Sequence, residues 1–404
     1  MISVEAALAR IRDAVAPLPA ELIGLNEGLG RVLAEDLASR RTQPPFAVSA
    51  MDGYAVRAAD AAAVPVRLKL VGYVPAGARH DGVVGPGEAV RIFTGAPVPD
   101  GADSIVIQED TEAEGESVLV REAPRLGQHI RAAGIDYVEG QIGLPAGTRL
   151  GPRHLGLAAG MNRPWLMVHR RPRVAILPTG DEVALPGDPV GPNQIISSNG
   201  AALAGLVTAA GGVPIQLGIG RDDSASLQRL AAGAAGADLL VTIGGASVGE
   251  HDLVQQALGQ AGLDIDFWKI AMRPGKPLMF GRLGTIPVLG LPGNPVSALI
   301  CGLLFLVPAL DRLQGLPGAG PMTEPALAGA DLPANDRRQD YLRARLDLDE
   351  SGGWRATPFQ KQDSSMMSAL AGADALILRP PHAAVAPVGT PIPIIRLGRQ
   401  PVML

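Results

Sequence analysis

The chain is poor in cysteine and carries no excess of positive charge. Its single cysteine, Cys301, cannot form a disulfide within the chain, which argues against a secreted, disulfide-stabilised scaffold. The formal net charge of −5 argues against the basic surface of a general nucleic-acid-binding protein. These two absences predict a cytoplasmic protein with no nucleic-acid partner.

Long hydrophobic runs are also scarce. The strongest membrane candidate, residues 295–310, is shorter than a bilayer span and contains Pro308, so we predict a buried core helix and no membrane partner. At the N-terminus, charged residues such as Glu5 and Arg10 interrupt the helical pattern that follows Ser3. This segment therefore lacks the apolar centre of a signal peptide.

The chain is rich in apolar residues, which can form hydrophobic cores, and in the Gly and Pro residues that favour turns. Apolar residues make up 47% of the 404 residues, and 51 Gly and 36 Pro are spread among apolar runs, which predicts several turn-rich domains. We predict an α/β multidomain fold with a parallel sheet. Its expected parts are helical linking segments at 1–41 and 139–172, a β-rich inserted domain at 42–138, an α/β domain at 173–317, and a β-rich C-terminal domain at 318–404.

The α/β prediction depends on alternation between residues 173 and 315. Short apolar runs alternate with helical patterns, as in a βαβ arrangement. Ligands of such sheets bind beyond the carboxyl ends of the strands. The expected strands are 174–177, 213–219, 239–243, 265–270 and 286–289, and glycine-rich or polar residues follow each of them.

The most informative of these exits is the loop after Leu239–Ile243, with the sequence GGASVGEHD. Its glycines would let backbone N–H groups approach an anion. A P-loop is rejected, because Glu250 and His251 stand where that motif requires Lys and Ser/Thr. Residues 245–249 do match the G-x-S-x-G of serine hydrolases, although a glycine-rich chain produces such a match easily. A plain tight turn is the third alternative.

We predict that the hydrolase match is accidental. Ser247 should not be acylated by a fluorophosphonate probe, because no histidine–acid pair is evident to activate it. Mass spectrometry of the treated protein checks this, and stoichiometric labelling at Ser247 would revive the hydrolase hypothesis.

The strand exits combine both signs of charge. Carboxylates of this kind hold Mg²⁺ together with a substrate phosphate, and Lys and Arg neutralise phosphate charge. A salt-bridged surface explains any one of these residues equally well, but the set favours Mg²⁺-assisted chemistry on a phosphorylated ligand. The proposed metal ligands are Glu182, Asp222 and Asp252, and the cations are Lys269, Arg273 and Lys276.

Eight motifs in order resemble one known family, the MoeA-type molybdopterin molybdenumtransferases, to which the C-terminal part of gephyrin belongs. They are MDGYAVR, TGAPVPDGAD, PTGDE, SSNG, RDD, GGASVGEHD, FWKIAMRPGKP and LPGNPVSA. The resemblance implies a molybdopterin-binding α/β domain, inserted and linking domains, and a C-terminal β-barrel-like domain in an elongated homodimer. It also implies that adenylylated molybdopterin and molybdate give molybdenum cofactor and AMP, with Mg²⁺. The implied protein partners are an upstream molybdopterin adenylyltransferase and downstream molybdoenzyme maturation factors.

The resemblance also assigns residues. The expected catalytic positions are Asp52, Thr94, Glu182, Asp222, Asp252, Lys269, Arg273, Arg343 and Ser364. The expected molybdopterin-binding positions are Asn199, Gly244, Gly245, Ser247, Gly249, Lys276, Gly293 and Asn294. Two positions depart from the family pattern: Arg273 replaces a Lys, and Ser197 stands where an Asp often lies.

Two other functions stay open on the sequence. The α/β domain resembles the upstream adenylyltransferase, and relatives of gephyrin can be scaffolds. The extra domains argue against the first, and the lack of long linkers or charged tails argues against the second. Because Asp52 and Thr94 lie in the inserted domain, we expect a homodimer to combine them with the α/β rim of the other chain.

Overall fold

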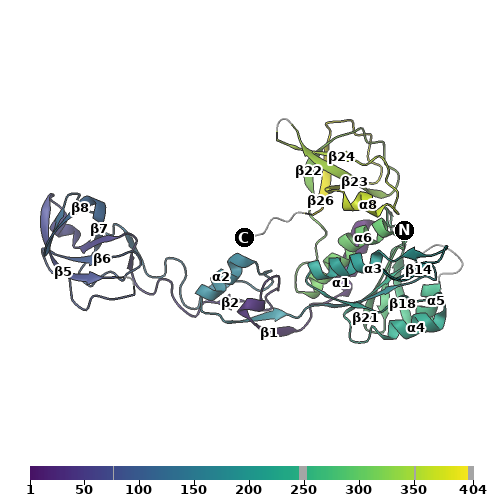
Figure 1. The fold of residues 1–404 in the computed structure, drawn as a ribbon, viewed down its shortest axis with the longest axis horizontal. Coiled ribbons are helices and arrows are strands. Elements are labelled where there is room, and N and C mark those ends of the chain that lie inside the picture. The colour runs from purple at the N-terminus through teal and green to yellow at the C-terminus, as the bar shows by residue number, and fades with distance from the viewer. Residues whose placement is uncertain (76, 245–252, 350–351, 399–404) are drawn as a thin grey trace.

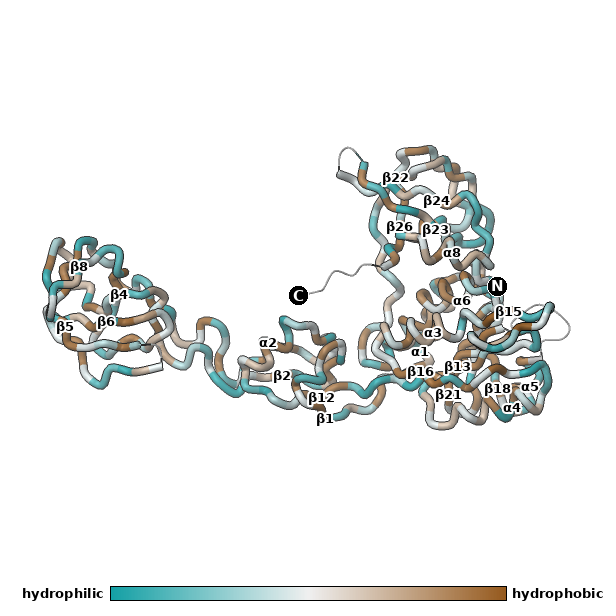
Figure 2. Tube along the Cα trace, viewed as in Figure 1, coloured by the Kyte–Doolittle hydropathy of each residue, from teal (hydrophilic) through white to brown (hydrophobic). Residues whose placement is uncertain are grey.

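A computed structural model of the chain describes residues 1–75, 77–244, 253–349 and 352–398. It is an elongated molecule (Figure 1). The inserted domain lies at one end, the linking domain lies in the middle, and the α/β domain lies at the other end beneath the C-terminal domain. Figure 2 shows hydrophobic stretches along the strands of the α/β domain and polar stretches on the outer loops.

The segments 1–41 and 139–172 contain both helix and strand, whereas the sequence predicted helix alone. Helix α1 (Val4–Ala14) is capped by Ser3 and stops before Pro17 and Pro19. Strand β1 (Ala20–Gly24) then pairs antiparallel with β12 (Trp165–His169). Strand β2 (Leu37–Ala38) likewise pairs with β11 (Ile142–Leu144). Within residues 139–170, α2 (Pro152–Gly160) is the one α-helix.

The inserted domain is built on a six-stranded sheet with the order β7-β4-β6-β5-β9-β8. The predicted β-rich texture of this region is confirmed. The strands are β4 (Gly53–Val56), β5 (Val66–Val74), β6 (Glu88–Ile92), β7 (Ser104–Ile107), β8 (Thr111–Glu114) and β9 (Ser117–Val120).

The α/β domain has a six-stranded sheet with the order β16-β13-β17-β21-β20-β18. The first four strands are parallel, as predicted, but β20 runs antiparallel to both neighbours, so the sheet is mixed. Because β18 is antiparallel to β20, its carboxyl end still lies on the same rim as that of β21. The strands are β13 (Arg173–Pro178), β16 (Val213–Gln216), β17 (Leu239–Ile243), β18 (Leu263–Trp268), β20 (Met279–Leu283) and β21 (Ile286–Leu291).

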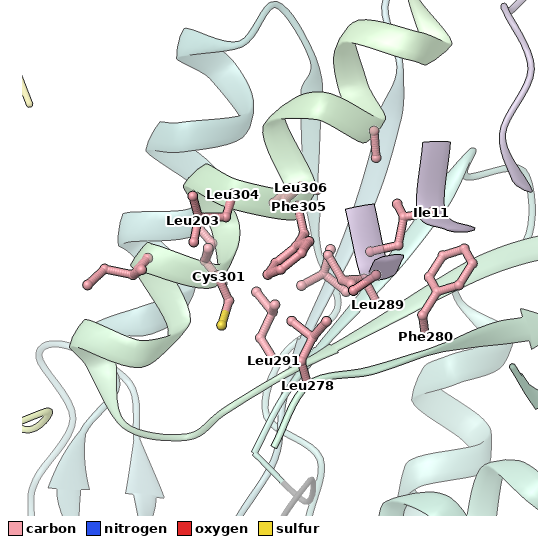
Figure 3. Packing of buried hydrophobic residues seen from close by; sticks show 14 of the residues in the cluster. Ile11, Leu203, Leu278, Phe280, Leu289, Leu291, Cys301, Leu304, Phe305 and Leu306 are labelled. Carbon is pink, nitrogen blue, oxygen red and sulfur yellow. The ribbon is translucent and has the colours of Figure 1, made fainter. Parts of the chain in front are cut away.

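Helices cover both faces of this sheet, which explains why its central strands are continuously apolar. On one face, α3 (Asn199–Ala209) and α1 pack with a long helical segment over strands β17 and β21. On the other, α4 (Ser224–Ala232) and α5 (Leu253–Gln260) cover β13 and β17. Figure 3 shows part of the cluster on the first face, with Ile11 of α1 close to Leu289, and Phe305 and Cys301 in the same core.

The long segment comprises α6 (Pro295–Cys301), a π-helical stretch η4 (Gly302–Leu306) and α7 (Val307–Leu313). Among the described residues, it is the one helix long and apolar enough to cross a membrane, but 72% of it is buried inside the protein. It is therefore a core helix, as predicted. Burial raises the pKa of the Cys301 thiol above its ordinary range, so this thiol is protonated and unreactive.

The C-terminal domain is a closed five-stranded barrel, because β23 pairs with both β24 and β25. Its strands are β22 (Glu324–Ala328), β23 (Gln339–Leu348), β24 (Trp354–Pro358), β25 (Ala375–Arg379) and β26 (Pro391–Arg396). A two-residue strand from the α/β domain, β19 (Met272–Arg273), pairs in parallel with β23. The barrel is thereby joined to the α/β rim by backbone hydrogen bonds.

One buried group in the sheet gives a stability prediction. The hydroxyl of Thr242 on β17 is 1% exposed and is the one buried side-chain polar atom of the described chain without a hydrogen-bond partner. Since an unsatisfied buried group costs about 1–3 kcal/mol, Thr242→Val should raise the free energy of unfolding by about 1 kcal/mol. Calorimetry of the α/β domain's transition checks this, and a lower transition temperature would contradict it.

Candidate functional site

A cleft of about 1020 Å³ lies where the barrel meets the α/β rim. The α/β domain contributes the residues after β13, β17 and β21 and the starts of α3 and α6. The segment Arg273–Lys276 forms another part of the wall, and barrel residues close the cleft from the other side. The site is therefore shared between two domains of the same chain.

Many of the predicted positions meet in this cleft. The lining includes the predicted catalytic residues Glu182, Asp222, Arg273 and Ser364, and the predicted binding residues Asn199, Gly244, Lys276, Gly293 and Asn294. The predictions for Gly245, Ser247, Gly249 and Asp252 lie outside the described residues.

The acidic part of the cleft is held by reciprocal backbone contacts. The Asp222 N–H donates to Asp181 Oδ1 at 3.2 Å, and the Asp181 N–H donates to Asp222 Oδ2 at 3.4 Å. Gly180 lies close by with a φ of +132°, and a Cβ there would come within 2.4 Å of the Glu182 carboxylate. A side chain at position 180 would therefore collide with the Glu182 carboxylate.

The described residues fit a Mg²⁺ ion that is shared with a substrate. Among them, no three His, Cys, Asp or Glu side chains are grouped closely enough to form an all-protein metal site. Mg²⁺ commonly takes only one or two carboxylates and completes its shell with water and substrate phosphates. Glu182 and Asp222 satisfy that smaller requirement, since both carboxylates line the cleft.

The basic part of the cleft contains Lys276 and Arg273. Arg273 is already paired with Asp340 of the barrel: its Nε donates to both carboxylate oxygens at 3.0 Å, and its Nη2 makes a further contact. Asp340 is only 5% exposed, whereas the Arg273 side chain is 49% exposed. Arg273 therefore joins two domains as well as facing the cleft.

A second link between the domains involves two of the predicted residues. Asn294 Nδ2 donates to Ser364 Oγ at 2.8 Å, and the backbone N–H of Val296 donates to the Ser364 carbonyl at 3.1 Å. On the same wall, Asn199 Nδ2 donates to the Gly293 carbonyl at 2.6 Å. These contacts fix the barrel loop 362–365 against the start of α6.

Two predicted catalytic residues that lie near the cleft, Arg343 and Lys269, are not part of its lining. Arg343 is 1% exposed, and its Nε and backbone N–H donate to Gln362 Oε1 at 3.2 and 3.0 Å. It therefore supports the cleft loop from beneath. Lys269 is half-buried, with its Nζ 4.0 Å from the centre of the Trp268 ring and a left-handed φ of 70°.

Asp52 and Thr94 lie together, but in the inserted domain. Both the backbone N–H and the hydroxyl of Thr94 donate to Asp52 Oδ1 at 2.8 Å. The backbone hydrogen bond is the larger cause of a lowered pKa for Asp52, so this carboxyl is ionised at neutral pH. Since the linking domain separates β4 and β6 from the α/β domain (Figure 1), the pair does not reach the cleft of its own chain.

An arginine supports this pair. Arg91 Nη1 donates to the Gly53 carbonyl at 2.9 Å, and Nη2 donates to Gln108 Oε1 at 2.8 Å. Its guanidinium lies 5.1 Å from the centre of the Tyr54 ring and 4.6 Å from that of Phe93. The residues flanking Asp52 and Thr94 are thereby held in a fixed arrangement.

Sequence analysis missed several residues of the cleft. The missed charged and amide side chains come from the barrel, whose loops have no periodic pattern. The run Arg337-Arg338 beside Asp336 was the available signal. The missed lining residues include Thr179, Ser297, Arg338, Gln362 and Asp363.

Comparison with known families covers most of the chain. Residues 2–161 match the family described as MoeA N-terminal region (domain I and II), and residues 175–312 match a probable molybdopterin binding domain. Residues 325–397 match the MoeA C-terminal region (domain IV). The three matches follow one another without overlap.

Individual relatives give the same result. A molybdopterin molybdenumtransferase of Nostoc sp. is 38% identical over 81% of this chain and 77% of its own length. The enzyme of that name from Haemophilus influenzae is 34% identical over 90% of each. A crystal structure of the molybdopterin biosynthesis MoeA protein from Pyrococcus horikosii is 32% identical, with a TM-score of 0.84 over 99% of this chain and 100% of that one.

Proposed function

Because this chain belongs to the MoeA family of molybdopterin molybdenumtransferases, we propose that it inserts molybdate into adenylylated molybdopterin and releases AMP. As a member of this family, the protein is a transferase of molybdenum cofactor biosynthesis. The observation that supports this reaction is one cleft that is lined by both carboxylates and cations.

The substrate explains both signs of charge. Adenylylated molybdopterin contains a phosphoanhydride, and molybdate is a tetrahedral dianion. Lys276 and Arg273 would neutralise oxyanion charge, and Arg273 does so with its orientation fixed by Asp340. The backbone of Gly244 and Gly293, with Asn294 and Asn199, would hold the pterin phosphate.

Glu182 and Asp222 would hold Mg²⁺ against the anhydride. When bound, the ion supplies neutralisation of the charge that develops on the phosphate oxygens as the anhydride bond breaks. Ser364, held by Asn294, would contact the substrate from the barrel side. Arg343 would act indirectly, by holding Gln362 and its loop in place.

We further propose that the protein works in the cytoplasm as a homodimer. In that dimer, Asp52 and Thr94 of one chain complete the cleft of the other. It would receive its substrate from a molybdopterin adenylyltransferase and pass its product to maturation factors of molybdoenzymes.

The test is a single-turnover assay with purified protein and adenylylated molybdopterin. AMP should appear only when both molybdate and Mg²⁺ are present. Formation of adenylylated molybdopterin from ATP and molybdopterin would instead support the adenylyltransferase alternative. Release of AMP without any molybdate requirement would contradict the proposed reaction.

Lys269 lies outside the cleft lining of its own chain, and we propose that it holds molybdate together with Arg273. Lys269→Ala should raise the molybdate concentration for half-maximal AMP release about tenfold, the size of one charge-assisted contact, while nucleotide binding changes less. Titration of AMP release with molybdate and of the protein with AMP measures the two effects. Equal losses in both would contradict the assignment of Lys269 to molybdate.

A further inference from the structure

The wall between the barrel and the segment Arg273–Lys276 contains a second arginine, Arg338. It lines the cleft together with Arg273 and comes from the loop before β23. Its Nη2 donates to Asp336 Oδ2 at 2.8 Å, and its Nε lies 3.3 Å from the same oxygen. Asp336 Oδ2 also lies 3.9 Å from Arg273 Nη1, so one carboxylate stands between two guanidinium groups.

The two arginines are held in the same way. Arg273 uses Nε and Nη2 for Asp340, and Arg338 uses Nε and Nη2 for Asp336. Within the described chain, the Nη1 of each arginine makes no hydrogen bond, although both residues line the cleft. Each guanidinium therefore has one side fixed by a carboxylate. The Nη1 of Arg338 is left to donate, and the Nη1 of Arg273 has only the 3.9 Å ion pair with Asp336.

The loop that carries Arg338 is itself rigid. Asn335 Nδ2 donates to the carbonyls of Arg338, Arg379 and Pro380 at 2.8 to 2.9 Å. The backbone N–H of Arg338 donates to Asp336 Oδ1 at 2.8 Å. An arginine held in this way loses little conformational freedom when it binds a ligand, which is the usual advantage of a preorganised site.

We propose that Arg338 is a further substrate-binding residue that pairs with Arg273 to bind a tetrahedral oxyanion, and that Asp336 is its positioning residue. This inference rests on the proposed function for the identity of the anion, which is either molybdate or a substrate phosphate. Two preorganised guanidinium nitrogens and the Lys276 ammonium offer such a dianion several charge-assisted donors. Neither Arg338 nor Asp336 is among the residues that the family resemblance assigns.

The experiment titrates the full-length protein with sodium molybdate, and separately with inorganic phosphate, by calorimetry. Arg338→Gln should weaken binding of at least one of the two anions about tenfold or more, the size of a lost charge-assisted contact. Arg337→Gln is the matched control, because this adjacent arginine is exposed and does not line the cleft. It should leave both affinities within about twofold, as expected of a fully solvated charge.

The variant Asp336→Asn distinguishes anion binding by Arg338 from a purely structural role of this residue. If Arg338 binds the anion, this variant should weaken binding less than Arg338→Gln does, because an amide oxygen still accepts a hydrogen bond from Arg338 and the negative charge that opposes the dianion is removed. If Arg338 only fastens the loop through Asp336, the two variants should lose affinity equally. Arg338→Lys, which keeps the charge, should recover part of the affinity.

The outcomes identify which anion binds and can be judged separately from the proposed reaction. A loss confined to molybdate assigns the pair to the metal oxyanion, and a loss confined to phosphate assigns it to a substrate phosphate; either supports the proposal. Unchanged affinities in Arg338→Gln, equal losses in Arg338→Gln and Asp336→Asn, or no binding of either anion to the wild-type protein would overturn it. The titration needs no turnover, so a failure of the AMP-release assay overturns the proposed reaction without affecting this result.

Discussion

Asp222→Ala is expected to reduce Mg²⁺-dependent AMP release by more than about 100-fold, because even an outer-shell partner of a metal typically contributes 10- to 100-fold. The folded protein should persist, since the described contacts of Asp222 are with Asp181 at an exposed strand exit. The measurement is AMP release over a Mg²⁺ titration, together with a thermal unfolding curve. Wild-type turnover at limiting Mg²⁺ would place the metal site elsewhere.

The neighbouring residue provides the control. Asp223 caps α4, where its Oδ1 accepts a hydrogen bond from the Ser226 N–H at 2.7 Å. Asp223→Ala should therefore lower the stability by about 1 kcal/mol, the typical cost of a lost N-cap. Its Mg²⁺ requirement should stay that of the wild type. Of these two adjacent aspartates, Asp222 would then affect turnover and Asp223 would affect stability.

The second large effect is recovery of activity from two inactive proteins. Asp52→Ala and Asp222→Ala homodimers should each be nearly inactive if both residues serve one site. When they are mixed by unfolding and refolding, half of the dimers are mixed, and each mixed dimer has one intact site if sites are shared between chains. Activity should therefore return to about one quarter of the wild-type value.

A matched control uses the double variant, Asp52→Ala with Asp222→Ala on one chain, mixed with the wild type. In a shared-site dimer each site of the mixed species has one lesion, so total activity should fall to about one quarter. If each site were built within one chain, the mixed species would keep one intact site, and about one half of the activity would remain. With equal amounts of the two refolded chains in each mixture, these fractions distinguish the two arrangements.

The sequence predicted the rim of the α/β sheet well because that site follows a local rule. The central parallel strands are continuous apolar runs, and ligand-facing residues follow them closely, as with Gly244 and Asn294. Strand β20 was missed because Met279–Leu283 contains Gly281 and Arg282, and it is fixed by its two antiparallel neighbours. This segment forms a strand because it pairs with its neighbours in the sheet, and its own β-propensity is weak.

The linking domain shows the opposite case. The segment Ala20–Gly24 has residues that favour helix, and it becomes a strand only by pairing with Trp165–His169 far along the chain. The role of Arg343 was equally hidden, since nothing local indicates that this arginine is 1% exposed. Arg338 was missed for the same reason, because its place in the cleft depends on how the barrel docks.

The pairing of β19 with β23 has a consequence for how the protein can be divided. Met272 and Arg273 belong by sequence to the α/β domain, yet they extend the sheet of the barrel, and Arg273 neutralises the buried Asp340. A fragment that begins near residue 318 would contain all five barrel strands but would leave this carboxylate without its partner and the edge of β23 uncovered. The barrel therefore cannot be transferred on its own. A chimera that exchanges it between relatives would have to include the RPGK segment at residues 273–276, which lies within the sequence of the α/β domain.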